Sequence, residues 1–202
     1  RIVTGYPNDE TKDAHPDDKF LDTAEIFHLW VIEGDFEDEF PLKKAGFNVI
    51  WTDDVKPYKK IKVRILNGAH TSLVAASLLS GIETVGETMK DELLSAYLGA
   101  VMKTEILPTI GGNEDSREFA DSVFDRFRNP FIQHKWRSIA LNSVSKYSVR
   151  VLPTILEYKE KFGAYPKGLT TSLAFLIYFY KHDTTDDSMA EAMEYIKTRS
   201  IN

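Results

Sequence analysis

The sequence predicts a mainly α protein, in which a helical domain follows a small mixed α/β segment. Short β-prone runs separated by polar stretches occupy the first part of the chain. After Pro57, apolar residues recur every three or four positions, which is the period of a helix. A chain of 202 residues is long enough for one domain with a sizeable core and a smaller segment. We therefore predict a mixed segment over residues 1–55 and a helical domain over residues 56–202.

The mixed segment is expected to contain strands. Residues 8–18 are polar and rich in acids, which favours a loop. The apolar run within residues 23–36 ends at Gly34 and favours a strand, and residues 47–51 favour a second one. The chain begins inside a strand-like phrase, Arg-Ile-Val-Thr-Gly-Tyr-Pro, which favours a fragment of a longer protein.

Helices are expected throughout the second part. The apolar positions predict helices over residues 73–79, 93–102, 119–127, 136–144, 152–158, 169–180 and 189–196. The second of these should stop before Pro108 and the following glycine pair. Residues 169–180 are apolar nearly all round, which predicts a central place in the bundle. Asp186, Asp187 and Ser188 offer caps for the last helix.

Composition excludes several classes of partner. The net charge of −6 and the pI of about 5.4 leave no basic field for nucleic acid or for an anionic membrane. The longest apolar stretch, residues 173–180, is far shorter than the roughly 20 residues that span a bilayer. The sequence has no cysteine, which excludes thiolate metal sites and is compatible with the reducing cytoplasm. His134 and His182 have no second ligand at metal spacing.

Lys62, Asn67 and His70 form the candidate catalytic group. On a continuous α-helix they would point at about 0°, 140° and 80°, spread over about 12 Å, so a bend between them would bring them closer. A lysine whose pKa is lowered by burial can exchange a proton with an alcohol oxygen, and amide and imidazole N–H groups can stabilise an oxyanion. On spacing alone, the three can equally be surface or helix-start residues, and Asn67-Gly68 can be a turn.

Residues 54–73, which contain these three side chains, resemble the signature segment of the mannitol-dehydrogenase family, the polyol-specific long-chain dehydrogenases. The family pattern is a lysine, four residues, an asparagine, two residues and a histidine. The resemblance implies that Lys62 is the general acid/base and that Asn67 and His70 hold the substrate oxygen, without a metal. It also implies a helical C-terminal dehydrogenase domain, of the 6-phosphogluconate-dehydrogenase C-terminal type, behind the end of a cofactor domain.

The resemblance covers nearly the whole chain. Residues 28–36 resemble the strand before the signature segment, and residues 105–110 and 128–132 resemble later helix landmarks. Ser145-Lys146, followed by residues 151–155, resembles a second stretch that contacts substrate.

Two departures argue against a plain mannitol substrate. Lys59 stands where mannitol-specific members commonly have a glutamate, and Ser138 stands where they carry an arginine, with Arg137 one position away. A uronate substrate would present a carboxylate, which a cation can bind. Arg64, Arg137 and Lys146 are the candidate substrate-binding cations, although each can instead be a solvated surface charge.

Residues 1–7, 28–34 and 67–71 are most similar to family members that interconvert tagaturonate and altronate with NAD(H) in hexuronate catabolism. Mannitol and fructuronate are the alternative substrates. The family's N-terminal Rossmann domain should precede this chain, and no Gly-rich cofactor loop is present here. NAD should therefore be bound mainly outside the chain, which alone should be inactive. A helical interaction or dimerisation module, without enzymatic activity, is the alternative from another class.

Overall fold

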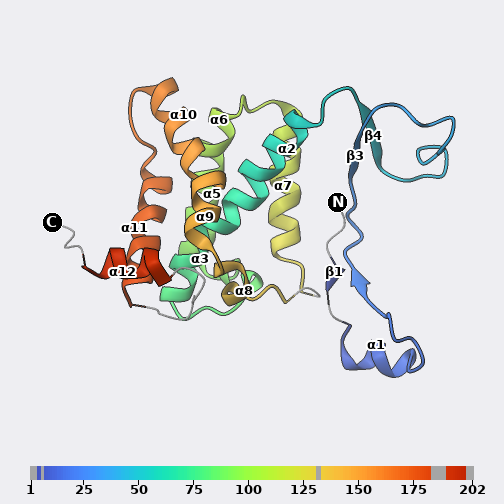
Figure 1. Ribbon diagram of the computed structural model, residues 1–202, viewed down its shortest axis with the longest axis horizontal. Coiled ribbons are helices and arrows are strands. Elements are labelled where there is room, and N and C mark those ends of the chain that lie inside the picture. Colours follow the sequence, from blue (N-terminus) through green and yellow to red (C-terminus); the bar gives the residue numbers. More distant parts are fainter. Residues whose placement is uncertain (1–3, 6, 131–132, 183–189, 199–202) are drawn as a thin grey trace. The chain divides into compact units, whose positions relative to one another are not determined.

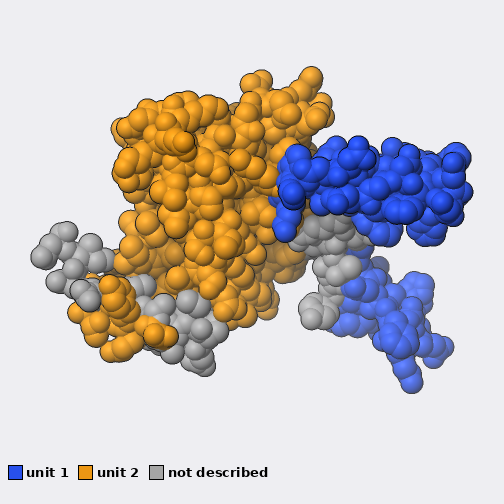
Figure 2. All heavy atoms as spheres, turned by 45° about the horizontal axis from the view of Figure 1, so that its top comes forward, with its two compact units in different colours: residues 1–59 blue, residues 60–202 orange. Residues whose placement is uncertain are grey.

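The computed structural model describes residues 4–5, 7–130, 133–182 and 190–198 (Figure 1). The chain divides into two compact units, residues 1–59 and residues 60–202, which Figure 2 colours blue and orange. Most described residues are helical, so the prediction of a mainly α protein is confirmed. None of the helices in the described part of the chain combines the length and apolarity that crossing a bilayer requires.

The described residues of the first unit contain two separate strand pairs. β1 (Thr4–Gly5) pairs antiparallel with β2 (Thr23–Ala24), whereas β3 (Trp30–Glu33) pairs parallel with β4 (Val49–Thr52). The single strand expected within residues 23–36 is therefore two short strands, because its two ends pair with different partners.

A short helix, α1 (Asp9–Ala14), replaces the loop expected over residues 8–18, so that prediction was wrong. The side chain of Asn8 accepts a hydrogen bond from the Thr11 N–H at 2.8 Å, which caps the first turn. Asp9 and Glu10 add negative charge at the helix N-terminus, where the helix dipole favours it. Asp9 and Glu10, whose acidic composition favoured a loop, therefore stabilise the first turn of a helix.

The described residues from Lys56 onward form a helical bundle. Its elements are α2 (Lys56–Lys62), η1 (Val63–Asn67), α3 (Gly68–Leu79), α4 (Val85–Thr88), α5 (Glu92–Val101), η2 (Met102–Ile106), α6 (Leu107–Thr109), α7 (Glu114–Phe127), α8 (Trp136–Ala140), α9 (Ser143–Arg150), α10 (Leu152–Phe162), α11 (Lys167–His182) and α12 (Ala190–Thr198), where η marks a π-helix. The predicted helix over residues 189–196 corresponds to α12, and its expected caps at 186–188 lie outside the described residues.

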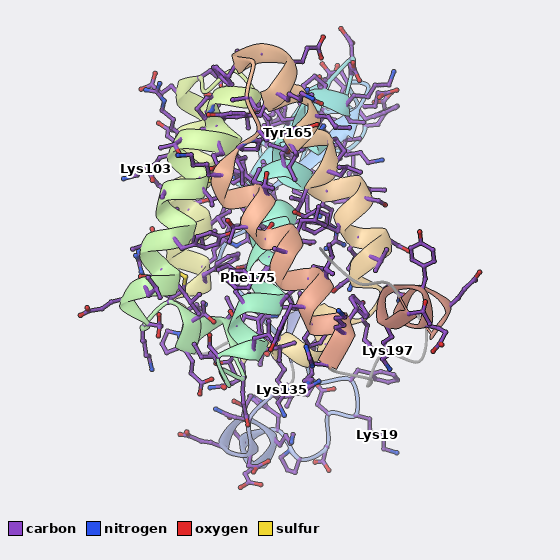
Figure 3. All side chains as sticks on the ribbon, turned by 90° about the vertical axis from the view of Figure 1, so that its left-hand side faces the viewer. Lys19, Lys103, Lys135, Tyr165, Phe175 and Lys197 are labelled. Carbon is purple, nitrogen blue, oxygen red and sulfur yellow. The ribbon has the colours of Figure 1, made fainter. Side chains whose placement is uncertain are left out.

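The central helix of the bundle is α3. It packs against α5, α8, α9 and α11, and every residue from Thr71 to Ser77 is buried. Figure 3, in which Phe175 marks α11, shows that helix lying along α3. The central place expected for residues 169–180 was wrong, since Tyr178 on α11 is 54% exposed. Small side chains such as Ala75 and Ser77 let α3 approach several neighbours at once.

Two predicted helix boundaries were also wrong. The helix from Glu92 continues past Pro108 to Thr109, because the π-turn η2 changes the hydrogen-bond register and leaves Pro108 in the first turn of α6. The helix expected over residues 136–144 breaks between α8 and α9. Asn142 there adopts a left-handed conformation with φ of 57°, which asparagine tolerates better than most residues.

Candidate active site

A π-helical turn separates Lys62 from His70. Lys62 is the last residue of α2, Asn67 is the last residue of η1, and His70 lies in the first turn of α3. The N–H of Gly68 bonds the carbonyl of Val63, five residues back, instead of a carbonyl four residues back. Single π-turns inside α-helices occur frequently at functional sites.

The π-turn changes how the three side chains are arranged. Because its hydrogen-bonded ring contains one extra residue, Asn67 and His70 point roughly as if they were four and seven residues after Lys62. Their directions then become about 40° and −20° from Lys62, instead of about 140° and 80° on an uninterrupted α-helix. The π-turn therefore reduces the angular spread of the Lys62, Asn67 and His70 side chains, so that they share one face of the helix.

His70 packs within a cluster of aromatic rings. Its ring stacks on Phe127 at the end of α7, with centroids 4.2 Å apart and an interplanar angle of 26°. The ring of Trp136 meets it edge-on at 6.1 Å, and the ring of His134 lies at 6.3 Å. The Nε2 atom of His70 is shielded from solvent. These contacts hold the imidazole in one orientation and exclude water from one of its nitrogens.

Trp136 is itself anchored to the central helix. Its indole N–H donates to the Thr88 hydroxyl at 2.8 Å, and that hydroxyl donates to Ser77 on α3 at 3.0 Å. Trp136, Thr88 and Ser77 are all fully buried. The Trp136 ring that contacts His70 is therefore bonded, through Thr88, to the same helix that carries His70.

Arg64 is buried and bonded to residues of α10. It is 8% exposed, and its guanidinium donates to the Thr154 hydroxyl at 2.8 Å and to the Glu157 carboxylate at 2.6 Å. Both partners belong to α10. These contacts give Arg64 a role in joining η1 to α10, and its assignment as a substrate contact stays a prediction.

Arg137 and Lys146 lie on the two short helices that pack against α3. Arg137 is exposed on α8, while Lys146 on α9 is partly buried and donates to the carbonyl of Ile139 at 2.9 Å. That bond satisfies a carbonyl near the C-terminus of α8, where a cation is also favoured by the helix dipole. The structure thus brings both residues to the neighbourhood of α3.

A second buried polar network lies at the start of α11. The carboxylate of Glu105, in η2, accepts the N–H groups of Gly168 and Leu169 at 2.7 and 2.8 Å. The Tyr147 hydroxyl donates to the carbonyl of Leu169 at 2.7 Å, and the Tyr97 hydroxyl donates to that of Gly168 at 2.7 Å. Burial raises the pKa of Tyr147 to about 12 and that of Tyr97 further. This network joins η2, α5 and α9 to the start of α11, and η2 also packs against η1.

The rings around His70 could not be recognised as site residues from the sequence. In the sequence, His134 has no second ligand at metal spacing, and Phe127 and Trp136 occupy ordinary apolar helix positions. Their contacts with His70 join residues 57 or more positions apart, which local periodicity cannot reveal.

The Gly111-Gly112 pair does not lie in the setting of a Rossmann phosphate loop. Gly111 and Gly112 lead into α7 from the short helix α6, whereas the phosphate loop of that fold joins a strand to a helix. Among the described residues, no group of three or more His, Asp or Glu side chains is placed to hold a metal ion.

Residues 54–198 match the family model of the mannitol dehydrogenase C-terminal domain. The chain therefore belongs to the mannitol dehydrogenase family, and the resemblance of its signature segment is confirmed. Its similar relatives include altronate oxidoreductases. It is 48% identical over 188 residues to that of Yersinia enterocolitica, covering 90% of this chain and 39% of the relative. It is 44% identical over 197 residues to that of Pectobacterium atrosepticum, covering 94% and 40%.

Solved structures share the fold. A Pseudomonas fluorescens mannitol 2-dehydrogenase in ternary complex with NAD and D-mannitol superposes with a TM-score of 0.79 at 24% identity, covering 98% of this chain and 43% of that one. A D-sorbitol dehydrogenase in substrate-free form also gives 0.79, at 26% identity, covering 93% and 40%. The chain thus spans about two fifths of the length of the relatives it matches.

Proposed function

We propose that this chain is the substrate-binding and catalytic portion of an NAD-dependent tagaturonate reductase, which interconverts tagaturonate and altronate in the cytoplasm. The observation that carries the proposal is the Lys62, Asn67 and His70 group on a helix interrupted by a π-turn, in a chain 48% identical to an altronate oxidoreductase. Oxidoreductase chemistry of sugars or sugar acids is common to its family and relatives.

Each of the three residues has a distinct role in the proposal. Lys62 gives a proton to the carbonyl oxygen of tagaturonate as that oxygen becomes an alkoxide, and it takes the proton back during altronate oxidation. Asn67 and His70 donate hydrogen bonds to the same oxygen, whose charge grows in the transition state. The stacking of His70 on Phe127 supports this role, because a fixed donor loses little entropy when it binds.

A cation is also needed for the carboxylate of a keto-uronic acid. Lys146 and Arg137 are the proposed carboxylate contacts, since both lie on helices that pack against α3. Arg64 is the weaker candidate, because its guanidinium is engaged by Thr154 and Glu157.

NAD(H) would be held by residues outside this chain and would supply the hydride. The parallel pair of β3 and β4 supports a continuation of the first unit into a larger sheet, because parallel strands are normally covered on both faces. On this proposal, residues 1–55 belong with a preceding Rossmann domain, and the chain alone has little or no turnover.

The test is NADH oxidation by the full-length protein that carries this chain, with tagaturonate and with fructose. We expect activity on tagaturonate and little on fructose. Lys62→Ala should lower the turnover number about 100- to 10,000-fold, because the proton donor is removed. Lys167→Ala, which removes an exposed lysine at the start of α11, is the matched control and should retain full activity.

Two results would contradict the proposal. Near-normal turnover of Lys62→Ala across the pH range would remove this lysine from the mechanism. Activity on fructose or mannitol with none on tagaturonate would keep the enzyme family and replace the substrate.

A further inference from the structure

The carboxylate of Glu157 on α10 bridges two cations that flank Lys62 in the chain. Its Oε1 atom accepts a hydrogen bond from Arg64 at 2.6 Å, and its Oε2 atom lies 3.2 Å from the ammonium nitrogen of Lys60. One turn earlier on α10, the hydroxyl of Thr154 accepts a bond from the same guanidinium at 2.8 Å. One helix therefore holds the segment on both sides of Lys62.

The helical period places Lys62 on the side of the segment away from α10. Lys60 and Arg64 are four residues apart and share one face, which is the face that meets Glu157. Lys62 lies two residues from each of them, so it is directed to the opposite side. The π-turn brings Asn67 and His70 toward that same side.

Burial makes the contact with Arg64 the stronger of the two. The side chain of Arg64 is 10% exposed and that of Glu157 is 35% exposed, so solvent screens this pair only in part. Removing the carboxylate would leave a buried cation without its charged partner. Lys60 is half exposed and is held less firmly, yet its charge lies just as near to Lys62 along the chain.

We propose that Glu157 is a positioning residue for Lys62. From α10, its carboxylate fixes the α2–η1 segment on the side opposite Lys62 and offsets the positive charges of Lys60 and Arg64. This inference rests on the proposed function, because it needs Lys62 to act as the general acid. A negative charge across the width of one helix, roughly 10 Å away, favours the protonated form of the lysine. Glu157 therefore opposes the effect of the two flanking cations, which disfavour the protonated form of Lys62.

The test is the pH dependence of tagaturonate reduction by the full-length protein. Reduction needs protonated Lys62, so kcat/KM falls as pH rises through the ionisation of this residue. Glu157→Gln should move that fall to lower pH by about half a unit, because the two flanking cations are no longer offset. It should also lower kcat about tenfold with little change in KM, since a displaced acid affects the transition state.

Glu160→Gln is the matched control, because it makes the same charge change at an exposed site on the same helix and should leave the profile unchanged. Lys60→Gln removes a half-exposed cation at little cost in stability and should move the fall to higher pH. If circular dichroism shows that Glu157→Gln does not fold, the pH profile of Lys60→Gln tests the positioning role instead.

An unchanged pH profile in a folded Glu157→Gln protein would overturn the inference, as would an unchanged profile of Lys60→Gln if the glutamate variant does not fold. Lys62→Ala, measured in the same series, separates the two proposals. If that variant is inactive while the Glu157 and Lys60 variants match the parent, only the positioning role fails. If Lys62→Ala remains active, the proposed function itself fails.

Discussion

At the scale of single residues, Tyr147 shows how burial changes the chemistry of a side chain. Its hydroxyl donates a hydrogen bond to the Leu169 carbonyl at 2.7 Å and lies 2.8 Å from the Ser172 hydroxyl. Its side chain is almost fully buried. Burial disfavours the phenolate and is the main reason that its pKa rises from 10.0 to about 12, with the nearby charge of Glu105 adding to the rise. The residue is a structural donor that stays protonated at physiological pH.

The raised pKa of Tyr147 predicts a loss of stability in alkali. The unfolded chain releases this proton near pH 10 and the folded chain only near pH 12, so the contribution is complete below pH 10 and is lost as pH rises toward 12. Urea unfolding, followed by circular dichroism at several pH values, should show this decline. Tyr147→Phe should be about 1 kcal/mol less stable at neutral pH, yet should decline less in alkali. Tyr178→Phe, at an exposed tyrosine, should match the parent; an equal alkaline decline in Tyr147→Phe would contradict the assignment.

The candidate site residues could be recognised from the sequence to different degrees. The Lys62, Asn67 and His70 pattern is readable in the sequence because it lies within nine residues. The partners of Arg64 lie 90 and 93 residues away, and nothing in the local pattern distinguishes a buried, engaged arginine from a solvated one. The placement of the candidate cations therefore needed the tertiary structure.

At the scale of elements, the two π-turns are the features that the periodicity did not reveal. Both continue an α-helix, and both contain the apolar residues that an α-helix would also place inward. The sequence pattern is therefore nearly the same for the two geometries. In η1 the extra residue turns Asn67 and His70 toward the side of Lys62, whereas in η2 it admits Pro108 and places Glu105 at the start of α11.

The start of α11 leaves no room for a side chain at position 168. A Cβ on Gly168 would overlap the Val101 side chain and lie 3.1 Å from each oxygen of Glu105. We expect Gly168→Ala to lower the free energy of unfolding by about 2 kcal/mol, measured by urea denaturation. Gly99→Ala, at a helical glycine whose Cβ would meet nothing within 4 Å, should instead stabilise by up to about 1 kcal/mol. Equal effects of the two substitutions would argue against tight packing at Gly168.

At the scale of the whole molecule, the two units differ in how completely they bury their apolar side chains. The helical unit has one continuous core that includes Leu73, Met102 and Trp136. In the first unit, Ile26 is 99% exposed and Phe20 is 94% exposed. Large apolar side chains of this kind, beside a two-stranded sheet, are typical of a surface that another part of a protein covers.

We therefore expect the isolated chain to bind an apolar dye and to self-associate. The double substitution Phe20→Ser and Ile26→Ser should reduce dye fluorescence and shift sedimentation toward the monomer, because it removes the most exposed apolar side chains. Leu93→Ser, at a single exposed leucine of the helical unit, is the control and should change neither measurement. Dye binding that persists at the parent level in the double variant would place the apolar surface elsewhere.

The sequence by itself determined the fold class, most helices of the bundle and the family, since helical periodicity and the signature segment are local patterns. It could not show that α3 rather than α11 is central, because both are rich in apolar residues and only packing selects between them. Nor could it show that His70 stacks on Phe127 or that Glu157 joins Lys60 to Arg64. Those contacts bring together residues 57 to 97 positions apart, and only the folded backbone decides which distant side chains meet.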